Sequence, residues 1–335
     1  LFRSLHFDFM VGSQIAGFDT MVQLTDDAPF IVVEGDEYLS SPIDRRPKFH
    51  LYKAEIGVIS GIAWDHVNVF PTFENYVDQF RIFAEAIPQS GKLIYCNKDA
   101  VLNSLIINSD VKAELISYSV PDYRLEDEKT IIKYNNTDYT LKVFGDHNLM
   151  NLEAARNVCN ILGVSSENFF EAIQSFTGAA RRLELIARNN SFIMFKDFAH
   201  SPSKLKATTE AVKKQFPHKK LIACMELHTF SSLSENFLLE YEGSMLAADE
   251  CIVYFNPSTI AHKKLKAITT EQVKEAFARQ DLTVITDSSE LLKLLHQKNY
   301  SDTVLLMMSS GTFDGLDLKK LSRSEEHTSE LQSPY

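Results

Sequence analysis

The sequence predicts an α/β protein in two parts, each built on a mainly parallel sheet. Two observations predict this class. From about Ser191 onward, short apolar runs alternate with helical patterns, and the first half also alternates strands with helices around one hairpin. Strands separated by helices of this length pair in parallel through right-handed crossovers, so each part is expected to fold as a layered sheet.

The second part is expected to hold a doubly wound, Rossmann-like sheet of about five strands. The predicted strands are Phe192–Phe195, Leu221–Met225, Cys251–Phe255, Thr283–Ile285 and Val304–Met308. Helices should fill the gaps, because apolar residues recur three and four apart behind a Ser or Thr cap. These predicted helices lie near Ser203–Gln215, Ser234–Ala247, Thr270–Arg279 and Ser288–Gln297.

The first part predicts strands at Phe30–Val33, Ile56–Ile62 and Leu93–Tyr95, with a helix from about Phe73 to Ala86. A hairpin follows, in which Ile131–Tyr134 and Tyr139–Phe144 flank the polar turn Asn135–Asp138. The next predicted helix, from Asn148 to about Leu162, carries a buried stripe of Ala154, Ala155, Val158, Ile161 and Leu162. The boundary between the parts is expected near Thr177 to Arg181.

Composition excludes several classes of protein. A net charge of -11 and a pI near 5.4 argue against a general nucleic-acid binder, so anionic ligands must be held locally. No apolar run approaches the roughly 20 residues of a membrane span, and the first residues lack the pattern of an export signal. The four cysteines have no paired spacing, which predicts reduced thiols without a disulfide or metal framework. We therefore expect a soluble cytoplasmic protein.

Polar residues directly after strands are the candidates for chemistry, because ligands of open α/β sheets gather at the carboxyl ends of strands. Three clusters qualify: Glu34 to Tyr38, then Asp65 with His66, and Asp197 with His200. A carboxylate at such a strand end suits a magnesium ion that bridges nucleotide phosphates, and Glu34 is the first choice. The alternatives are a solvated acidic turn for Glu34 and a structural role for His66.

Two further groups carry the same kind of ambiguity. Asn148 and Asn151 share one helix face and could meet a purine edge, or Asn148 could simply cap the helix. Arg181 and Arg182, at the expected boundary, could reach a phosphoryl group or could be solvated, and the basic run from Arg45 to Lys48 could face an anionic substrate.

Taken together, the motifs resemble the Mur ligases, ATP-dependent enzymes that build the peptide stem of peptidoglycan. Five motifs stand in the family's order, namely VVEGDEY (32–38), DH (65–66), GDHNLMN (145–151), ARRLE (180–184) and DFAHSP (197–202). The resemblance implies a partial central ATP-binding domain at residues 1–178, with a P-loop-like sheet and a hairpin insertion. Residues 179–322 would be the C-terminal domain, and residues 323–335 a non-native tail.

The resemblance also implies roles for individual residues, with ATP and Mg²⁺ as cofactors. Glu34 and His66 would help to bind magnesium, and Arg182 would reach the ATP phosphates. His147, Asn148 and Asn151 would lie at the adenine, Asp197 at the ribose or phosphate, and His200 in the nucleotide pocket. The segment Glu226 to Ser232 would read the incoming substrate, through His228, Thr229 and Ser231.

Within the family, EGDEY, the segment Asp44 to Phe49 and DFAH are most similar to the murein peptide ligase branch. That branch joins the recovered tripeptide L-alanyl-γ-D-glutamyl-meso-diaminopimelate to UDP-N-acetylmuramate. The alternatives are the sibling that adds L-alanine to the same acceptor, a non-catalytic nucleotide-binding module, and a folate-type polyglutamate ligase. The sequence holds no glycine-rich phosphate loop of the form G-x-x-G-K followed by Ser or Thr. A chain without that loop is expected to bind ATP poorly and to catalyse little.

Overall fold

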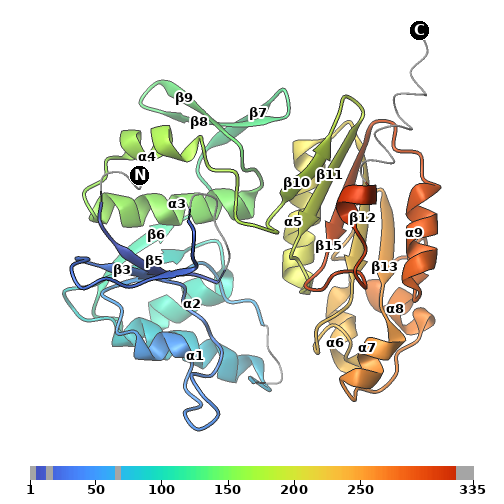
Figure 1. Cartoon of the computed structure of the whole chain (residues 1–335). Helices are drawn as coiled ribbons and strands as arrows, with labels where there is room; N and C mark the ends of the chain where they lie inside the picture. The colour runs from blue at the N-terminus through green and yellow to red at the C-terminus, as the bar shows by residue number, and fades with distance from the viewer. Residues whose placement is uncertain (1–4, 13–17, 65–68, 322–335) are drawn as a thin grey trace. The chain divides into compact units, whose positions relative to one another are not determined.

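The computed structural model describes residues 5–12, 18–64 and 69–321 (Figure 1). The chain divides into two compact units, unit 1 (residues 1–180) and unit 2 (residues 181–335). Both units are α/β, as the sequence predicts. Asp65, His66 and the 323–335 tail lie outside the described residues. Among the described helices, none combines the length and the apolar character that crossing a membrane requires.

The described part of unit 1 contains three small sheets. The first has the order β2 (Val22–Gln23), β1 (Asp8–Met10), β3 (Ile31–Val33), with β1 and β3 parallel. The second is parallel throughout and contains β4 (Ile56–Ile59), β5 (Lys92–Cys96) and β6 (Glu114–Tyr118). The third is an antiparallel meander of β7 (Tyr123–Glu126), β8 (Lys129–Tyr134) and β9 (Thr137–Leu141).

Three helices of unit 1 begin where the side chain of a polar residue caps the first turn. Thr72 caps α1 (Phe73–Ala86), Asp99 caps α2 (Ala100–Asn108) and Ser165 caps α4 (Ser166–Ile173). The 3-10 helix η1 (Lys48–Leu51) precedes them. The hairpin turn consists of Asn135 and Asn136 alone, both in the left-handed region, so β9 begins two residues earlier than the sequence predicts.

Helix α3 (Asp146–Ile161) lies between two apolar clusters of unit 1 (Figure 1). Ala154 packs with β5 and α2 in one cluster, whereas Leu149 and Leu152 pack with the hairpin and α4 in the other. The predicted single stripe is therefore wrong at Ala155, which is exposed, because a helix covered on two sides buries two faces.

The described part of unit 2 is built on a six-stranded sheet with the order β10-β11-β15-β12-β13-β14. The edge strand β10 is antiparallel to β11, and the other neighbours are parallel. The bounds are β10 (Glu184–Arg188), β11 (Phe192–Asp197), β12 (Lys220–Glu226), β13 (Glu250–Tyr254), β14 (Thr283–Ile285) and β15 (Thr303–Met308). The sequence prediction missed β10.

The helices of unit 2 are α5 (Pro202–Gln215), α6 (Glu235–Leu238), α7 (Pro257–His262), α8 (Thr270–Phe277) and α9 (Ser288–His296), with the 3-10 helix η2 (Leu239–Tyr241). The predicted helix from Ser234 to Ala247 is wrong beyond Tyr241, because Gly243 has a φ of +70° and the chain continues in turns.

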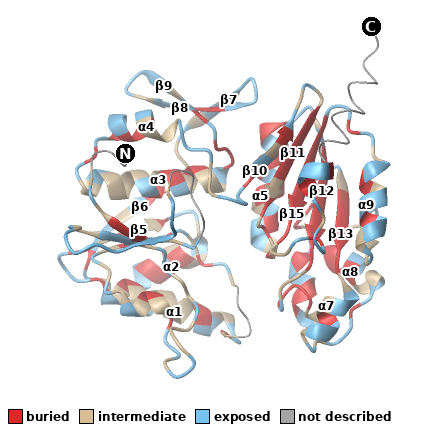
Figure 2. Cartoon of the chain, viewed as in Figure 1, coloured by how far each residue is buried: buried red, intermediate tan, exposed pale blue. Residues whose placement is uncertain are grey.

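Helices α5 and α9 cover opposite faces of this sheet, and all six residues of β15 are buried at its centre (Figures 1 and 2). Central strands that are covered on both faces read as continuous apolar runs, which is why the sequence revealed them. The four cysteines are free, as expected, and Cys96, Cys224 and Cys251 are buried.

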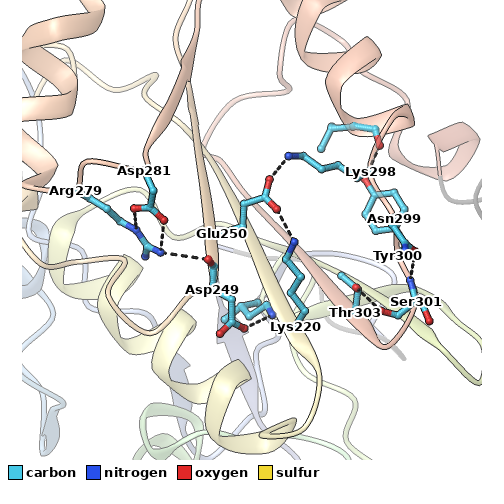
Figure 3. Close-up of polar contacts among 12 residues, drawn as sticks. Lys220, Asp249, Glu250, Arg279, Asp281, Lys298, Asn299, Tyr300, Ser301 and Thr303 are labelled. Atoms are coloured by element: carbon cyan, nitrogen blue, oxygen red, sulfur yellow. Dashed lines mark hydrogen bonds and ion pairs between the residues drawn. The ribbon is translucent and has the colours of Figure 1, made fainter.

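At the amino ends of β12 and β13, charged side chains pair with one another (Figure 3). Glu250 accepts from Lys220 Nζ at 2.8 Å and also from Lys298 Nζ. Asp249 accepts from Leu221 N and Lys213 Nζ, both at 2.7 Å. These ion pairs link the strands of unit 2 at their amino ends. The candidate functional groups of this unit lie at the carboxyl ends of the strands.

Candidate functional site

In unit 1, the carboxylate of Glu34 is anchored at the carboxyl ends of β1 and β3. The backbone N–H of Glu34 donates to Met10 O at 2.8 Å, and its side-chain Oε2 accepts from Gly12 N at 2.5 Å. A Cβ at Gly12 would lie 2.9 Å from that oxygen, so glycine permits the approach. An exposed carboxylate held in this way fits a hard cation such as Mg²⁺. The described residues contain no cluster of three metal-ligating side chains, and His66 lies outside them.

Two ion pairs form within the segment that follows Glu34. Asp36 accepts from Lys48 Nζ at 2.6 Å, which raises the pKa of the lysine. Arg46 donates to both carboxylate oxygens of Asp44, and these hydrogen bonds lower the pKa of Asp44 to about 2. Arg46 and Lys48 therefore lie in local ion pairs, which favours a local role for them over contact with an anionic substrate.

The predicted adenine-contacting residues lie in the first two turns of α3. Gly145 is the N-cap with a φ of 88°, so the alternative reading of Asn148 as the cap is wrong. Asn148 Nδ2 instead donates to Phe144 O at 2.8 Å and closes the first turn. His147 is half-buried and Asn151 is exposed one turn further on. Their predicted contacts with a nucleotide stay predictions.

In unit 2, the structure brings Arg182, Asp197 and His200 together around Phe198. The Arg182 guanidinium lies 5.6 Å from the Phe198 ring centroid, and His200 Nδ1 lies 2.9 Å from Phe198 O. The His200 ring meets the Phe198 ring edge-on at 5.2 Å. Three residues predicted to contact the nucleotide thus form one local group at the end of β11.

Asp197 holds the loop that carries Arg182. Its carboxylate is buried, with Oδ2 accepting from Leu183 N and Oδ1 from Ala199 N, both at 2.7 Å. Arg181 and Leu183 have φ values of 59° and 45°, a conformation that side chains with a Cβ rarely adopt. The buried carboxylate therefore stabilises a strained loop, and its predicted contact with ribose or phosphate stays a prediction.

The predicted substrate segment follows β12. His228 has a half-exposed side chain, whereas Ser231 is buried and Thr229 Oγ1 accepts from Ser232 N at 3.1 Å to form a turn. Of the three predicted substrate residues, His228 and Thr229 are partly exposed and Ser231 is buried. Phe230 is half-exposed in the same segment, with the Lys263 Nζ over its ring at 4.4 Å from the centroid.

A second carboxylate is buried at this end of the sheet, that of Glu226, which the sequence analysis named only as the first residue of the substrate segment, without a role of its own. Its Oε2 accepts from Ser309 Oγ and from Phe313 N at 2.8 Å. Asp314 in turn accepts from Tyr254 Oη and Asn256 Nδ2. Polar residues directly after a strand were the candidates in the sequence analysis. The SSGTFD run directly after β15 meets the same criterion, which would have identified this loop.

Polar groups therefore form a continuous row across the carboxyl ends of β11, β15, β12 and β13, in that spatial order. Ser309 joins the two halves of the row, because its N–H donates to Asp197 O at 3.0 Å and its hydroxyl donates to Glu226. The arrangement places the Arg182 loop and the His228 loop at one edge of one sheet, where ligands of such sheets bind.

Comparison with known proteins agrees with this architecture. Residues 13–159 match the model of the Mur ligase middle domain, and residues 181–311 match that of the Mur ligase, glutamate ligase domain. The chain is 25% identical over 325 residues to a UDP-N-acetylmuramate--L-alanine ligase from Desulfitobacterium hafniense, covering 92% of the chain and 71% of the relative. A ligase of the same name from Caldicellulosiruptor bescii is 33% identical over 261 residues, with 73% and 54% covered. The chain thus spans about half the length of the second relative.

Solved structures share the fold. A murein peptide ligase from Psychrobacter arcticus superposes with a TM-score of 0.64 at 21% identity, covering 97% of this chain and 72% of that one. A MurF ligase from Thermotoga maritima in complex with ADP gives a TM-score of 0.70 at 15% identity, with 99% and 76% covered. At these identities the likeness concerns the fold alone.

Proposed function

The chain belongs to the Mur ligase family, carrying its middle and C-terminal domains, and from this premise we propose that the protein is an ATP-dependent ligase that forms an amide bond on UDP-N-acetylmuramate in cytoplasmic peptidoglycan synthesis. The observation that supports this most is the row at the carboxyl edge of unit 2. It combines a guanidinium that packs on Phe198, that of Arg182, with a half-exposed histidine, His228, at the same end of the sheet.

The proposed reaction has two steps. A muramate carboxylate oxygen attacks the γ-phosphorus of ATP, the bond to ADP breaks, and an acyl phosphate forms. The incoming amine then attacks the acyl carbon, the carbon–oxygen bond to phosphate breaks, and the amine loses a proton. Activation is required because a carboxylate is a poor electrophile, and Arg182 would offset the negative charge on the transferred phosphoryl group.

The described side chains suit parts of this task. ATP and Mg²⁺, when bound, would supply the phosphoryl group and neutralise its charge, with Glu34 and His66 proposed as metal ligands. His147, Asn148 and Asn151 in unit 1 and Arg182, Asp197 and His200 in unit 2 are the proposed nucleotide contacts. His228, Thr229 and Ser231 are the proposed contacts of the incoming group.

We propose the tripeptide L-alanyl-γ-D-glutamyl-meso-diaminopimelate as the incoming group, on the strength of the EGDEY, Asp44 to Phe49 and DFAH motifs. L-alanine is the second candidate, because similar relatives carry the name of L-alanine ligases. The two substrates share the L-alanyl group that carries the amine nucleophile and differ beyond its carbonyl, so kinetics can separate them.

The test is ADP release by the protein expressed from its complete gene, since the printed sequence holds no phosphate loop. Release that requires both UDP-N-acetylmuramate and the tripeptide supports the first proposal. Equal release with L-alanine in place of the tripeptide supports the second candidate. ATP binding without ADP release under either condition would overturn the ligase proposal in favour of a nucleotide-binding module.

A further inference from the structure

Glu226 connects two loops that leave neighbouring strands of unit 2. The first loop, residues 227–233, follows β12 and carries His228. The second, residues 309–315, follows β15. The Glu226 side chain is 2% exposed and points between them, with Oε2 bound by Ser309 Oγ and Phe313 N and Oε1 3.6 Å from His228 Nδ1. Each carboxylate oxygen therefore faces a different loop.

The second loop needs an external restraint. Phe313 and Asp314 have φ values of 50° and 55°, and Gly315 follows at 81°. Two successive residues with a Cβ in the left-handed region are strained, and they persist only where surrounding contacts fix them. The acceptor that Glu226 offers to Phe313 N, together with the bonds from Tyr254 and Asn256 to Asp314, provides that restraint.

Gly311 lies against both Glu226 and His228. A Cβ built on it would meet Glu226 Oε2 at 2.8 Å and His228 Cγ and Nδ1 at 2.9 Å, and its φ lies outside the left-handed region. The Nδ1 side of the imidazole is thus packed between a buried carboxylate and the Gly311 backbone. The His228 side chain is still 39% exposed, and these contacts involve Nδ1 and Cγ rather than Nε2.

A carboxylate beside Nδ1 favours the tautomer with the proton on that nitrogen, which leaves Nε2 as a hydrogen-bond acceptor. Within the proposed ligase function, on which this inference rests, we propose that Glu226 is a positioning residue and that His228 Nε2 accepts a hydrogen bond from the incoming amine. The amine belongs to the L-alanyl group, which the tripeptide and L-alanine share. The inference therefore holds for either incoming substrate.

The decisive variant is Glu226→Gln in the protein expressed from its complete gene. Glutamine keeps an oxygen that accepts from Ser309 and Phe313, so the second loop stays in place. Its amide NH₂ then faces His228 Nδ1, which reverses the tautomer and turns Nε2 into a donor. We expect the KM for the incoming substrate to rise about tenfold, the effect of one hydrogen bond, and the KM for ATP to stay within about twofold.

A double-mutant cycle separates positioning from stability. If Glu226 acts through His228, Glu226→Gln combined with His228→Ala raises the KM no further than His228→Ala alone. Gly311→Ala, whose Cβ would press on both the Glu226 carboxylate and the His228 imidazole, should raise the same KM. Thr209→Val is the control, because it removes a buried hydroxyl that contacts Leu205 O and Ser244 O, away from both loops.

Nitrogen NMR of His228 gives a readout that a purely structural role would not change. The proton is expected on Nδ1 in the wild type and on Nε2 in Glu226→Gln. An unchanged tautomer, or additive effects of the two substitutions on KM, would overturn the inference while an active wild type keeps the ligase proposal. A wild-type protein that releases no ADP with either incoming substrate would overturn the ligase proposal, and this inference with it.

Discussion

Replacing Asp197 tests whether a buried carboxylate holds the Arg182 loop. In Asp197→Ala, the N–H groups of Leu183 and Ala199 lose their acceptors at 2.7 Å. An unsatisfied buried amide costs about 1–3 kcal/mol, so two predict a loss of about 2–6 kcal/mol. Asp197→Asn keeps one acceptor oxygen and should lose about half as much. Because domains are stable by about 5–15 kcal/mol, either change is measurable.

The assay is urea unfolding of the whole chain followed by two signals. The only tryptophan, Trp64, lies in unit 1 and donates to Phe70 O at 3.1 Å, so its fluorescence follows unit 1. Far-UV circular dichroism follows both units. We expect the Asp197 variants to lower the midpoint of the dichroism transition that belongs to unit 2 and to leave the Trp64 transition unchanged.

A wild-type unfolding curve for Asp197→Ala would refute the reasoning, because two buried amides would then have lost their acceptors without cost. A shift of both transitions would also refute it, because the carboxylate contacts residues of unit 2. A direct contact of Asp197 with ribose or phosphate would give a different result. In that case Asp197→Asn would weaken ATP binding by more than the change in stability accounts for.

Two further predictions concern the other edge of the sheet and unit 1. Burial raises the pKa of Glu250, but hydrogen bonds from Lys220 and Lys298 lower it more, so the net pKa lies below the ordinary 4.5. The contacts of Glu250 with the two lysines therefore stabilise the fold at pH values above 4.5, and this contribution is lost as the pH falls through the lowered pKa. The urea midpoints of Glu250→Gln and wild type should differ at neutral pH and converge in acid. Gly12→Ala should displace the Glu34 carboxylate and raise the Mg²⁺ concentration for half-maximal ADP release about tenfold. Gly35→Ala is the control, because its Cβ would lie 3.7 Å from Phe49 Cβ, an ordinary contact distance, and it should change that concentration little.

Elements with strong local signals could be predicted from the sequence. Helix α1 has the expected bounds because Thr72 caps it, and α9 lies within one residue of its prediction because Asp287 accepts from Ser289 N and Glu290 N. Strand β14 also has the expected bounds. The edge strand β10 was missed, since its exposed positions interrupt the apolar pattern and its pairing with β11 is antiparallel.

The candidate site was predictable only where one segment carries the whole signal. Asp197 and His200 stand in one short motif, and the structure brings them together with Arg182. Glu226 and Ser309 are 83 residues apart, and their contact depends on β12 and β15 being neighbours. No local pattern states which strands are adjacent, so the link between the two loops required the structure.

The two buried carboxylates at the carboxyl ends of the strands have the same structural role, which is to hold a strained loop. Asp197 and Glu226 each end a central strand, and each accepts from the backbone of a loop that contains left-handed residues other than glycine. Ser309 connects the two strand ends, because its N–H donates to the backbone O of Asp197 and its hydroxyl donates to the Glu226 carboxylate. Because rigid strands fix both carboxylates, the Arg182 loop and the His228 loop are held at a fixed distance from one another. The proposed reaction brings a phosphoryl group and an amine to one carboxylate, and such a reaction requires that kind of fixed spacing.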